Sequence, residues 1–246
     1  MGRMIDLELN GTKLPVYIAQ PSGDIKGGLI VIHEVWGLAN HIKTVADRFA
    51  AEGYLSLAPD LLSGTGLSEE FFGTLQKDLF DPAKRTAAQP KLREMMAPIQ
   101  APGFAETTVE NLKQCFDYLY KQESTGQKVA SIGFCFGGSY SFSLAVHEPR
   151  LKAALPFYGH ADFSVDELKK IKCPIMAFYG ENDERLMESL PKLEADMKAA
   201  GVDLTVKVYP NCGHAFFNDS NPHAYNQEAA QDAMAKSLTF LAANLS

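Results

Sequence analysis

The 246-residue sequence predicts an α/β protein with a mostly parallel central sheet and helices on both faces. Short, continuous apolar runs recur along the chain, and such runs are typical of strands buried on both faces of a sheet. Segments with apolar residues at helical spacing lie between these runs, and this alternation favours parallel strand pairing. Since α/β domains of this length are common, we expect residues 1–246 to form one domain.

The N-terminal segment differs from this pattern because its apolar and polar side chains alternate. Residues 5–9 and 14–18 therefore predict two half-buried strands, and Asn10-Gly11 between them is a strong hairpin-turn signal. Pro15 has no amide proton to donate, so the second strand is predicted at an edge of the sheet.

The continuous apolar runs begin at residues 28–33 and 54–58. A helix is predicted between them over about 40–50, with Asn40 as its N-cap and Gly53 just beyond its end. Further along the chain, Thr107 and Glu110 have the spacing of a capping box and predict a helix start. Later strands are predicted at 129–134, 153–158, 175–179 and 204–209, with helices at about 188–200 and 223–243.

Residues 61–105 interrupt the alternation with prolines at 82, 90, 98 and 102 and with glycines that include Gly64 and Gly66. Short helical patterns at 68–79 and 83–96 argue against a loop without structure. We predict a helical insertion at the carboxyl end of the sheet, where α/β proteins place their ligand contacts.

Composition excludes several classes of protein. The charge balance of 23 Lys+Arg against 30 Asp+Glu, a net −7, argues against a nucleic-acid binder and against a polybasic membrane-surface protein. No apolar run reaches the ~18 residues of a membrane span, and the first residues lack an apolar signal region. The four cysteines are widely spaced with no zinc-site pattern, so we expect reduced thiols, no metal and a cytoplasmic location.

The most specific motif is Gly133-Phe134-Cys135-Phe136-Gly137-Gly138, between a predicted strand and a predicted helix. It has the G-x-S-x-G pattern of a nucleophile elbow, with cysteine in place of serine. Small residues at Gly133 and Gly137 allow a sharp turn, which exposes the central side chain at a helix N-terminus where a thiolate is stabilised. The alternative is a buried structural cysteine beside a glycine-rich turn.

Asp183 and His214 each follow a later predicted strand, so the chain order is nucleophile, acid, base. This is the order of the α/β-hydrolase triad and predicts that fold. Cys135 would attack a carbonyl carbon, His214 would transfer protons, and Asp183 would orient the imidazole. Taken singly, Asp183 has an alternative interpretation as a surface-turn residue, and His214 as an ordinary histidine.

Glu34 follows the first buried strand, at a place where serine hydrolases often have a glycine that feeds a backbone N–H to the oxyanion hole. Its apolar flanks, Val35 and Trp36, predict partial burial. A buried glutamate needs a hydrogen-bond partner or a raised pKa. The alternative is a surface glutamate at a strand end.

Together, Glu34-Val35-Trp36-Gly37, the cysteine elbow, Asp183 and Gly213-His214 resemble the dienelactone hydrolase (carboxymethylenebutenolidase) family from about residue 5 to 245. The resemblance implies an α/β-hydrolase without a cofactor that cleaves a dienelactone-like substrate through a thioester-linked intermediate, and it favours a monomer. It implies that Cys135, Asp183 and His214 are the triad and that Glu34 holds the resting thiol and accepts its proton. It also implies that the backbone N–H groups of Val35 and Phe136 form the oxyanion hole.

The substrate site departs from the family pattern. The family's dienelactone enzymes place an arginine four residues after the catalytic histidine, whereas this chain has Asn218 there. An anionic lactone therefore loses one bidentate partner, and a neutral ester or lactone is as plausible a substrate. Arg85 in the insertion is a candidate for another substrate contact, although Arg93 is an alternative. Trp36 and Phe216 are candidate apolar pocket walls, together with Phe134, Phe136 and Phe217, but aromatic residues are equally common in protein cores.

A cysteine-dependent hydrolase of a small ester or lactone is thus the leading interpretation. A thiol-based redox protein is an alternative, with Cys212 as the resolving thiol for Cys135. A ligand-binding protein on a hydrolase fold is another, since fold does not determine function. A metal site of Cys212, His214 and Asp219 is conceivable, but it would occupy the triad base.

Overall fold

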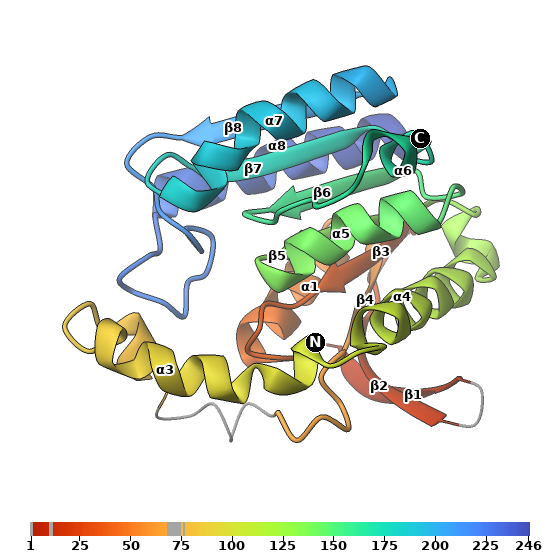
Figure 1. Cartoon of the computed structure of the whole chain (residues 1–246). Helices are drawn as coiled ribbons and strands as arrows, with labels where there is room; N and C mark the ends of the chain where they lie inside the picture. Colours follow the sequence, from red (N-terminus) through yellow and green to blue (C-terminus); the bar gives the residue numbers. More distant parts are fainter. Residues whose placement is uncertain (1, 10–11, 68–74, 76) are drawn as a thin grey trace.

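The computed structural model describes residues 2–9, 12–67, 75 and 77–246. Its described strands form one eight-stranded sheet in the order β1-β2-β4-β3-β5-β6-β7-β8 (Figure 1). β1 and β2 pair antiparallel, β2 pairs antiparallel with β4, and every other neighbouring pair is parallel, which confirms the predicted sheet. The strands are β1 Arg3–Leu9, β2 Thr12–Ala19, β3 Gly27–Ile32, β4 Tyr54–Pro59, β5 Val129–Phe134, β6 Ala153–Phe157, β7 Ile175–Gly180 and β8 Leu204–Tyr209.

Helices cover both faces of this sheet, as predicted. In the view of Figure 1, α4, α5 and α7 lie in front of the strands, and α1 and α8 lie behind them. Every residue of the central strands β3, β4, β5 and β6 is buried, because helices pack on both sides. The helices and helical turns are α1 Asn40–Ala51, α3 Arg85–Met95, η1 Ala97–Gln100, α4 Phe104–Tyr120, η2 Glu123–Thr125, α5 Phe136–His147, α6 Val165–Leu168, α7 Glu184–Ala200 and α8 Gln227–Asn244.

The predicted N-terminal hairpin is present, with Leu9 opposite Thr12. Its turn, Asn10-Gly11, lies outside the described residues. The prediction that Pro15 places the second strand at an edge is wrong, because β2 lies between β1 and β4. The β2–β4 ladder starts at Val16, so Pro15 lies just beyond it, and the Pro15 carbonyl accepts a hydrogen bond from the backbone N–H of Asp60 at 2.8 Å.

Two predicted helix starts are also wrong. The N-cap of α1 is Ala39, and Asn40 is the first helical residue. Helix α4 begins at Phe104, before the predicted capping box, with Gly103 as its N-cap at φ +86°. A left-handed glycine can thus start the helix earlier than the side-chain pattern indicates.

The insertion at 61–105 contains helix α3, close to the predicted piece at 83–96, whereas most of the predicted piece at 68–79 lies outside the described residues. Its buried side chains form a second, smaller hydrophobic core, which packs against Val35 and Trp36 at the carboxyl end of β3. The insertion therefore lies beside the predicted site. Among the described residues, no helix combines the length and the apolar character needed to cross a membrane. The small core consists of Leu62, Leu67, Leu75, Leu79, Ala88 and Met96.

Candidate active site

Cys135 lies on a sharp turn between strand β5 and helix α5, as the motif predicts. Its backbone has φ +55° and ψ −110°, a conformation that side-chain-bearing residues rarely adopt. A Cβ on Gly133 would lie 1.9 Å from the carbonyl oxygen of Gly137, and a Cβ on Gly137 would lie 2.2 Å from that of Ile32. Both positions therefore require glycine, and the turn exposes part of the Cys135 side chain to a cavity.

Asp183 and His214 lie beyond the carboxyl ends of β7 and β8, and the fold brings them together. His214 Nδ1 lies 2.5 Å from Asp183 Oδ2. Gly180 permits this approach, because a Cβ there would lie 2.4 Å from the carbonyl oxygen of Cys212. The backbone N–H of Asn182 donates to that same carbonyl at 2.8 Å and holds the two loops in register.

Cys135, Asp183 and His214 line the same two cavities, and Cys135 lies close enough to affect the pKa of His214. The Asp183 side chain is 11% exposed and the His214 side chain is 43% exposed. Burial acts to lower the pKa of His214, but the effects of the neighbouring Cys135 and Asp183 outweigh it and raise that pKa well above its usual value. The arrangement thus favours an imidazolium beside the sulfur atom.

Glu34 is buried directly after β3, as its apolar flanks predict, and is 3% exposed. Its Oε2 accepts a hydrogen bond from Asn218 Nδ2 at 2.5 Å, and its Oε1 accepts one from the Tyr158 hydroxyl at 3.3 Å. Among the described residues, no hydrogen bond joins Glu34 to Cys135. Burial raises the pKa of Glu34, and the nearby imidazoles of His41 and His214 and the two hydrogen bonds offset part of that rise.

Two candidate substrate contacts are contradicted. Asn218 is 1% exposed, and its side chain is engaged by Glu34 and by Ser220, whose hydroxyl donates to Asn218 Oδ1 at 2.6 Å. Phe216 is completely buried, with its ring packed against those of Phe157, Tyr158 and Tyr209. Both residues follow His214 on a loop that turns into the core, so neither side chain reaches the cavity.

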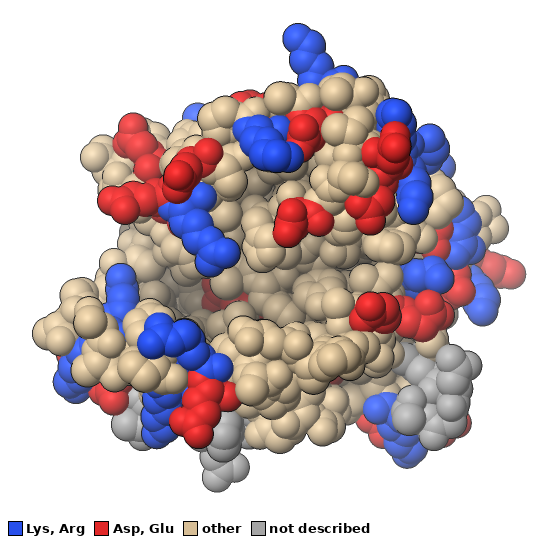
Figure 2. Space-filling model, viewed as in Figure 1, with Lys and Arg blue, Asp and Glu red and all other residues tan. Residues whose placement is uncertain are grey.

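The other candidates do line the site. Cys135 lies where two cavities of about 660 and 720 Å³ meet, and both cavities are lined by Val35, Asp183 and His214. Figure 2 shows this face hollowed between the segments of α3 and α7, with charged side chains around the hollow. Trp36 and Arg85 line the first cavity, and Phe136 lines the second, whereas Phe134 and Phe217 belong to the buried core.

The backbone N–H groups of Val35 and Phe136 lie on segments that flank Cys135. Phe136 is the first residue of α5, and the first N–H groups of a helix have no acceptor within the helix. The next N–H in the helix, that of Gly137, donates instead to the carbonyl oxygen of His33 at 3.0 Å. This bond ties the start of α5 to the segment that carries Glu34 and Val35.

Tyr158 and His41 are site residues that the sequence analysis missed. Tyr158 has φ +38°, and its ring centroid lies 5.0 Å from that of His214. Four of the five described non-glycine residues with positive φ line the two cavities: Cys135, Tyr158, Asn211 and Ala215. Such backbone strain concentrates at functional sites. The sequence signal for Tyr158 is its place at the carboxyl end of a buried strand, whereas His41 lies within a helix and has no comparable signal.

The alternative metal and redox sites find no support in the geometry. Among the described residues, no group of three or more His, Cys, Asp or Glu side chains is placed to hold a metal ion. Asp219 is bonded to His41 and Arg48 rather than grouped with Cys212 and His214. Cys212 is 2% exposed, and burial raises the pKa of its thiol.

A strained elbow after a central parallel strand, with an acid and a histidine on later strand ends, defines the α/β-hydrolase class. A model of the dienelactone hydrolase family matches residues 14–245. The chain therefore belongs to the dienelactone hydrolase family and is a hydrolase of the carboxymethylenebutenolidase type.

Individual relatives agree with this assignment. "Putative carboxymethylenebutenolidase" of Saccharolobus solfataricus is 33% identical over an alignment of 256 positions, gaps included, which covers 98% of each chain. "Protein usf" of Aquifex pyrophilus is 33% identical over 98% of this chain and 97% of that protein. The solved structure of a "Putative Dienelactone Hydrolase" from Klebsiella pneumoniae has the same fold, with a TM-score of 0.83 and 23% identity over 98% of each chain.

Proposed function

We propose that the protein hydrolyses a small-molecule ester or lactone through a Cys135–His214–Asp183 triad. The observation that carries this proposal is the His214 imidazole, which lies 2.5 Å from Asp183 Oδ2 and lines the same cavities as Cys135 at the strained elbow. A histidine between a carboxylate and a nucleophile is the arrangement that activates the nucleophile. The raised pKa of His214 supports an imidazolium that can protonate the leaving alcohol once Cys135 has attacked.

In the proposed reaction, the Cys135 thiolate attacks the carbonyl carbon and the carbonyl oxygen becomes an oxyanion. The N–H groups of Val35 and Phe136 stabilise that oxyanion. As the intermediate collapses, the bond to the alcohol oxygen breaks, His214 protonates this oxygen, and a thioester remains on Cys135. Water then attacks the thioester with His214 as general base, and the free acid and the thiol are released.

Glu34 has a separate role in the proposal, which is to take the proton of the resting thiol when substrate binds. A buried carboxylate with a raised pKa is suited to accept a proton. Tyr158 connects Glu34 to His214, since its hydroxyl donates to the Glu34 carboxylate and its ring lies against the His214 imidazole. A thiol that stays protonated until substrate arrives resists oxidation.

The substrate class depends on the cavity. Asn218 is engaged by Glu34, so the family's second arginine has no counterpart at that position and a neutral substrate is as suitable as the anionic dienelactone. Arg85 and Trp36 on the first cavity are the proposed substrate contacts. We also propose that residues 1–246 form one domain that acts as a cytoplasmic monomer without a cofactor, nucleic-acid or membrane partner.

Hydrolysis of an activated aryl ester and of dienelactone by the wild type and by Cys135→Ala tests the proposal. We expect the alanine variant to lose activity by a factor of about 10³ or more, because no other described thiol lines the cavities. Cys173→Ala is the matched control, since Cys173 is buried in the hydrophobic core. Full activity in Cys135→Ala would contradict the triad, and an acyl-thioester trapped on Cys135 by acid quenching would support it.

A further inference from the structure

A second histidine–carboxylate pair lies buried next to the site. His41 on helix α1 is 7% exposed, and its Nδ1 lies 2.8 Å from Asp219 Oδ1. Arg48, about two turns further along the helix, donates to Asp219 Oδ2 at 2.5 Å. The His41 ring packs edge-on against Phe134 and Phe217, with centroids 6.3 and 6.4 Å away.

The other nitrogen of His41 is the unusual feature. Nε2 is buried and has no hydrogen-bond partner among the described residues. Buried polar atoms are nearly always hydrogen-bonded, so an exception needs a reason. His41 is also the charged group with the largest electrostatic effect on the buried Glu34 carboxylate, and that effect favours the ionised carboxylate.

His33 differs from His41, because both of its ring nitrogens are hydrogen-bonded. His33 is also fully buried, but its Nε2 accepts a hydrogen bond from the Leu61 N–H at 3.0 Å, so its Nδ1 carries the proton and donates to the Glu34 carbonyl at 2.6 Å. Both nitrogens are used, and burial lowers the pKa of this imidazole. His33 is therefore a neutral structural residue, whereas His41 has one nitrogen on a carboxylate and the other uncommitted.

One loop connects both histidine–carboxylate pairs to Glu34. His214, Asn218 and Asp219 follow one another after β8: His214 bonds Asp183, Asn218 bonds Glu34, and Asp219 bonds His41. The remaining titratable groups near Glu34 are Tyr158, which follows β6, and Cys135 at the elbow, with Arg48 beyond Asp219. Among the described residues, His41 and His214 are the cationic groups with an electrostatic effect on the Glu34 carboxylate.

We propose that His41, held by Asp219, stabilises the ionised form of Glu34 and thereby sets the pH at which Glu34 can take the Cys135 proton. His41 and Asp219 are positioning residues, because they act through Glu34. The proposal rests on the function proposed above for Glu34. Without the His41 charge, burial would raise the pKa of Glu34 further, so a higher pH would be needed to ionise it.

The test is the pH dependence of kcat/KM for an activated aryl ester between about pH 5 and pH 9, with the rate of Cys135 alkylation by iodoacetamide measured in parallel. In His41→Gln and Asp219→Asn, the acidic limb of both profiles should move up by about one pH unit. Activity at about pH 6 then falls roughly tenfold and returns at alkaline pH. A purely structural defect would instead lower the whole profile.

Asp47→Asn is the matched control, because Asp47 lies on the same helix but bonds Tyr17 and the Gly2 N–H. If His41→Gln does not fold, Asp219→Asn alone decides, since that side chain is 31% exposed on a loop. The inference is overturned if the acidic limbs of the folded variants coincide with those of the wild type and Asp47→Asn.

Glu34→Gln separates this inference from the proposed function. In that background, His41→Gln should cause no further change in the pH profile, whereas a direct effect of His41 on His214 would persist and would overturn the inference. If Glu34→Gln itself changes neither alkylation nor turnover, the proposed role of Glu34 fails, and the inference fails with it. If Glu34→Gln removes the limb while His41→Gln and Asp219→Asn leave it in place, the inference alone fails.

Discussion

At the residue scale, Glu34 shows how a site residue can oppose stability. Its carboxyl is buried after β3, and the pKa is raised from the usual 4.5. The unfolded chain therefore releases this proton at a lower pH than the folded protein does. Between the two pKa values, rising pH favours unfolding, because the unfolded state binds fewer protons.

Glu34→Gln should consequently stabilise the protein more at neutral pH than at acidic pH. The difference in Tm between variant and wild type is expected to grow from about pH 4 to about pH 8, because glutamine has no proton to release. Thermal denaturation at both pH values measures it. Glu110→Gln is the control, since the Glu110 side chain is 54% exposed in a surface ion pair. Equal Tm differences at both pH values would contradict this prediction.

The sequence predicts the roles of some site residues but not the hydrogen-bond partners of others. Cys135, Gly133 and Gly137 are evident from the sequence because steric limits on a sharp turn act within a few residues. The partners of Glu34 are not evident, because Asn218 is 184 positions away and Tyr158 is 124 positions away. From the sequence, Asn218 fits a substrate contact and a buried hydrogen-bond donor equally well. Only the path of the loop after His214 shows that its side chain is buried against Glu34.

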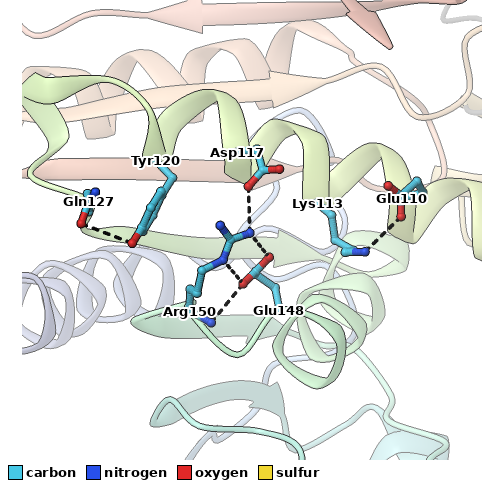
Figure 3. Close-up of polar contacts among 7 residues, drawn as sticks. All are labelled: Glu110, Lys113, Asp117, Tyr120, Gln127, Glu148 and Arg150. Atoms are coloured by element: carbon cyan, nitrogen blue, oxygen red, sulfur yellow. Dashed lines mark hydrogen bonds and ion pairs between the residues drawn. The ribbon is translucent and has the colours of Figure 1, made fainter. Parts of the chain in front are cut away.

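At the element scale, an arginine joins the end of α5 to α4 (Figure 3). Arg150 forms two hydrogen bonds with Glu148 at 2.7 Å, one from Nε to Oε1 and one from Nη2 to Oε2, and its Nη2 also donates to Asp117 on α4 at 2.8 Å. Its guanidinium lies 4.7 Å from the ring centroid of Phe116. The Glu148 side chain is only 3% exposed, so Arg150 is the cation that compensates a buried carboxylate.

Arg150→Met should therefore destabilise the protein by about 2 kcal/mol, because it leaves a buried carboxylate without its cation. Since the Arg150 side chain is 46% exposed, the loss should be smaller than for a fully buried pair. Lys113→Met is the control: the Lys113–Glu110 pair in the same view is exposed on both sides and should change stability by less than about 0.5 kcal/mol. Urea denaturation measures both, and similar losses in the two variants would contradict the argument.

Element boundaries depended on contacts that local patterns do not contain. The capping-box pattern at Thr107 predicted a start for α4, but the helix begins at Phe104 after a left-handed Gly103. Pro15 predicts an edge strand, yet β2 lies between β1 and β4. The sheet tolerates Pro15 because the ladder between β2 and β4 begins one residue later, at Val16. The left-handed conformation of Gly103 and the missing N–H of Pro15 are thus both accommodated, but at a helix start and in an inner strand that the local patterns do not predict.

At the scale of the whole molecule, the insertion brings a distant segment to the cavity. Its small core packs on Trp36, and Arg85 of helix α3 lines the first cavity, with its Nε donating to the Leu79 carbonyl at 3.0 Å. This bond fixes the direction of the guanidinium but leaves donors for a ligand. The insertion can therefore contribute to substrate selection without touching the reacting atoms.

Arg85→Met should raise KM for the anionic dienelactone by about tenfold and leave KM for a neutral aryl ester nearly unchanged, because only the anion loses a charge-assisted hydrogen bond. Steady-state kinetics with both substrates measures the difference. Arg93→Met is the control, since Arg93 is exposed in the last turn of the same helix. Equal effects on the two substrates would exclude a specific contact between Arg85 and the anion.

The sequence by itself determined the alternation of strands and helices, the glycine-flanked turn at Cys135, and the chain order of Cys135, Asp183 and His214. These features follow from side-chain periodicity and backbone sterics, which act over a few residues. Only the tertiary structure decided that Asn218 and Phe216 turn inward and that Asp219 bonds His41. Those contacts join segments about 180 residues apart, and packing between distant segments is not encoded in any local pattern.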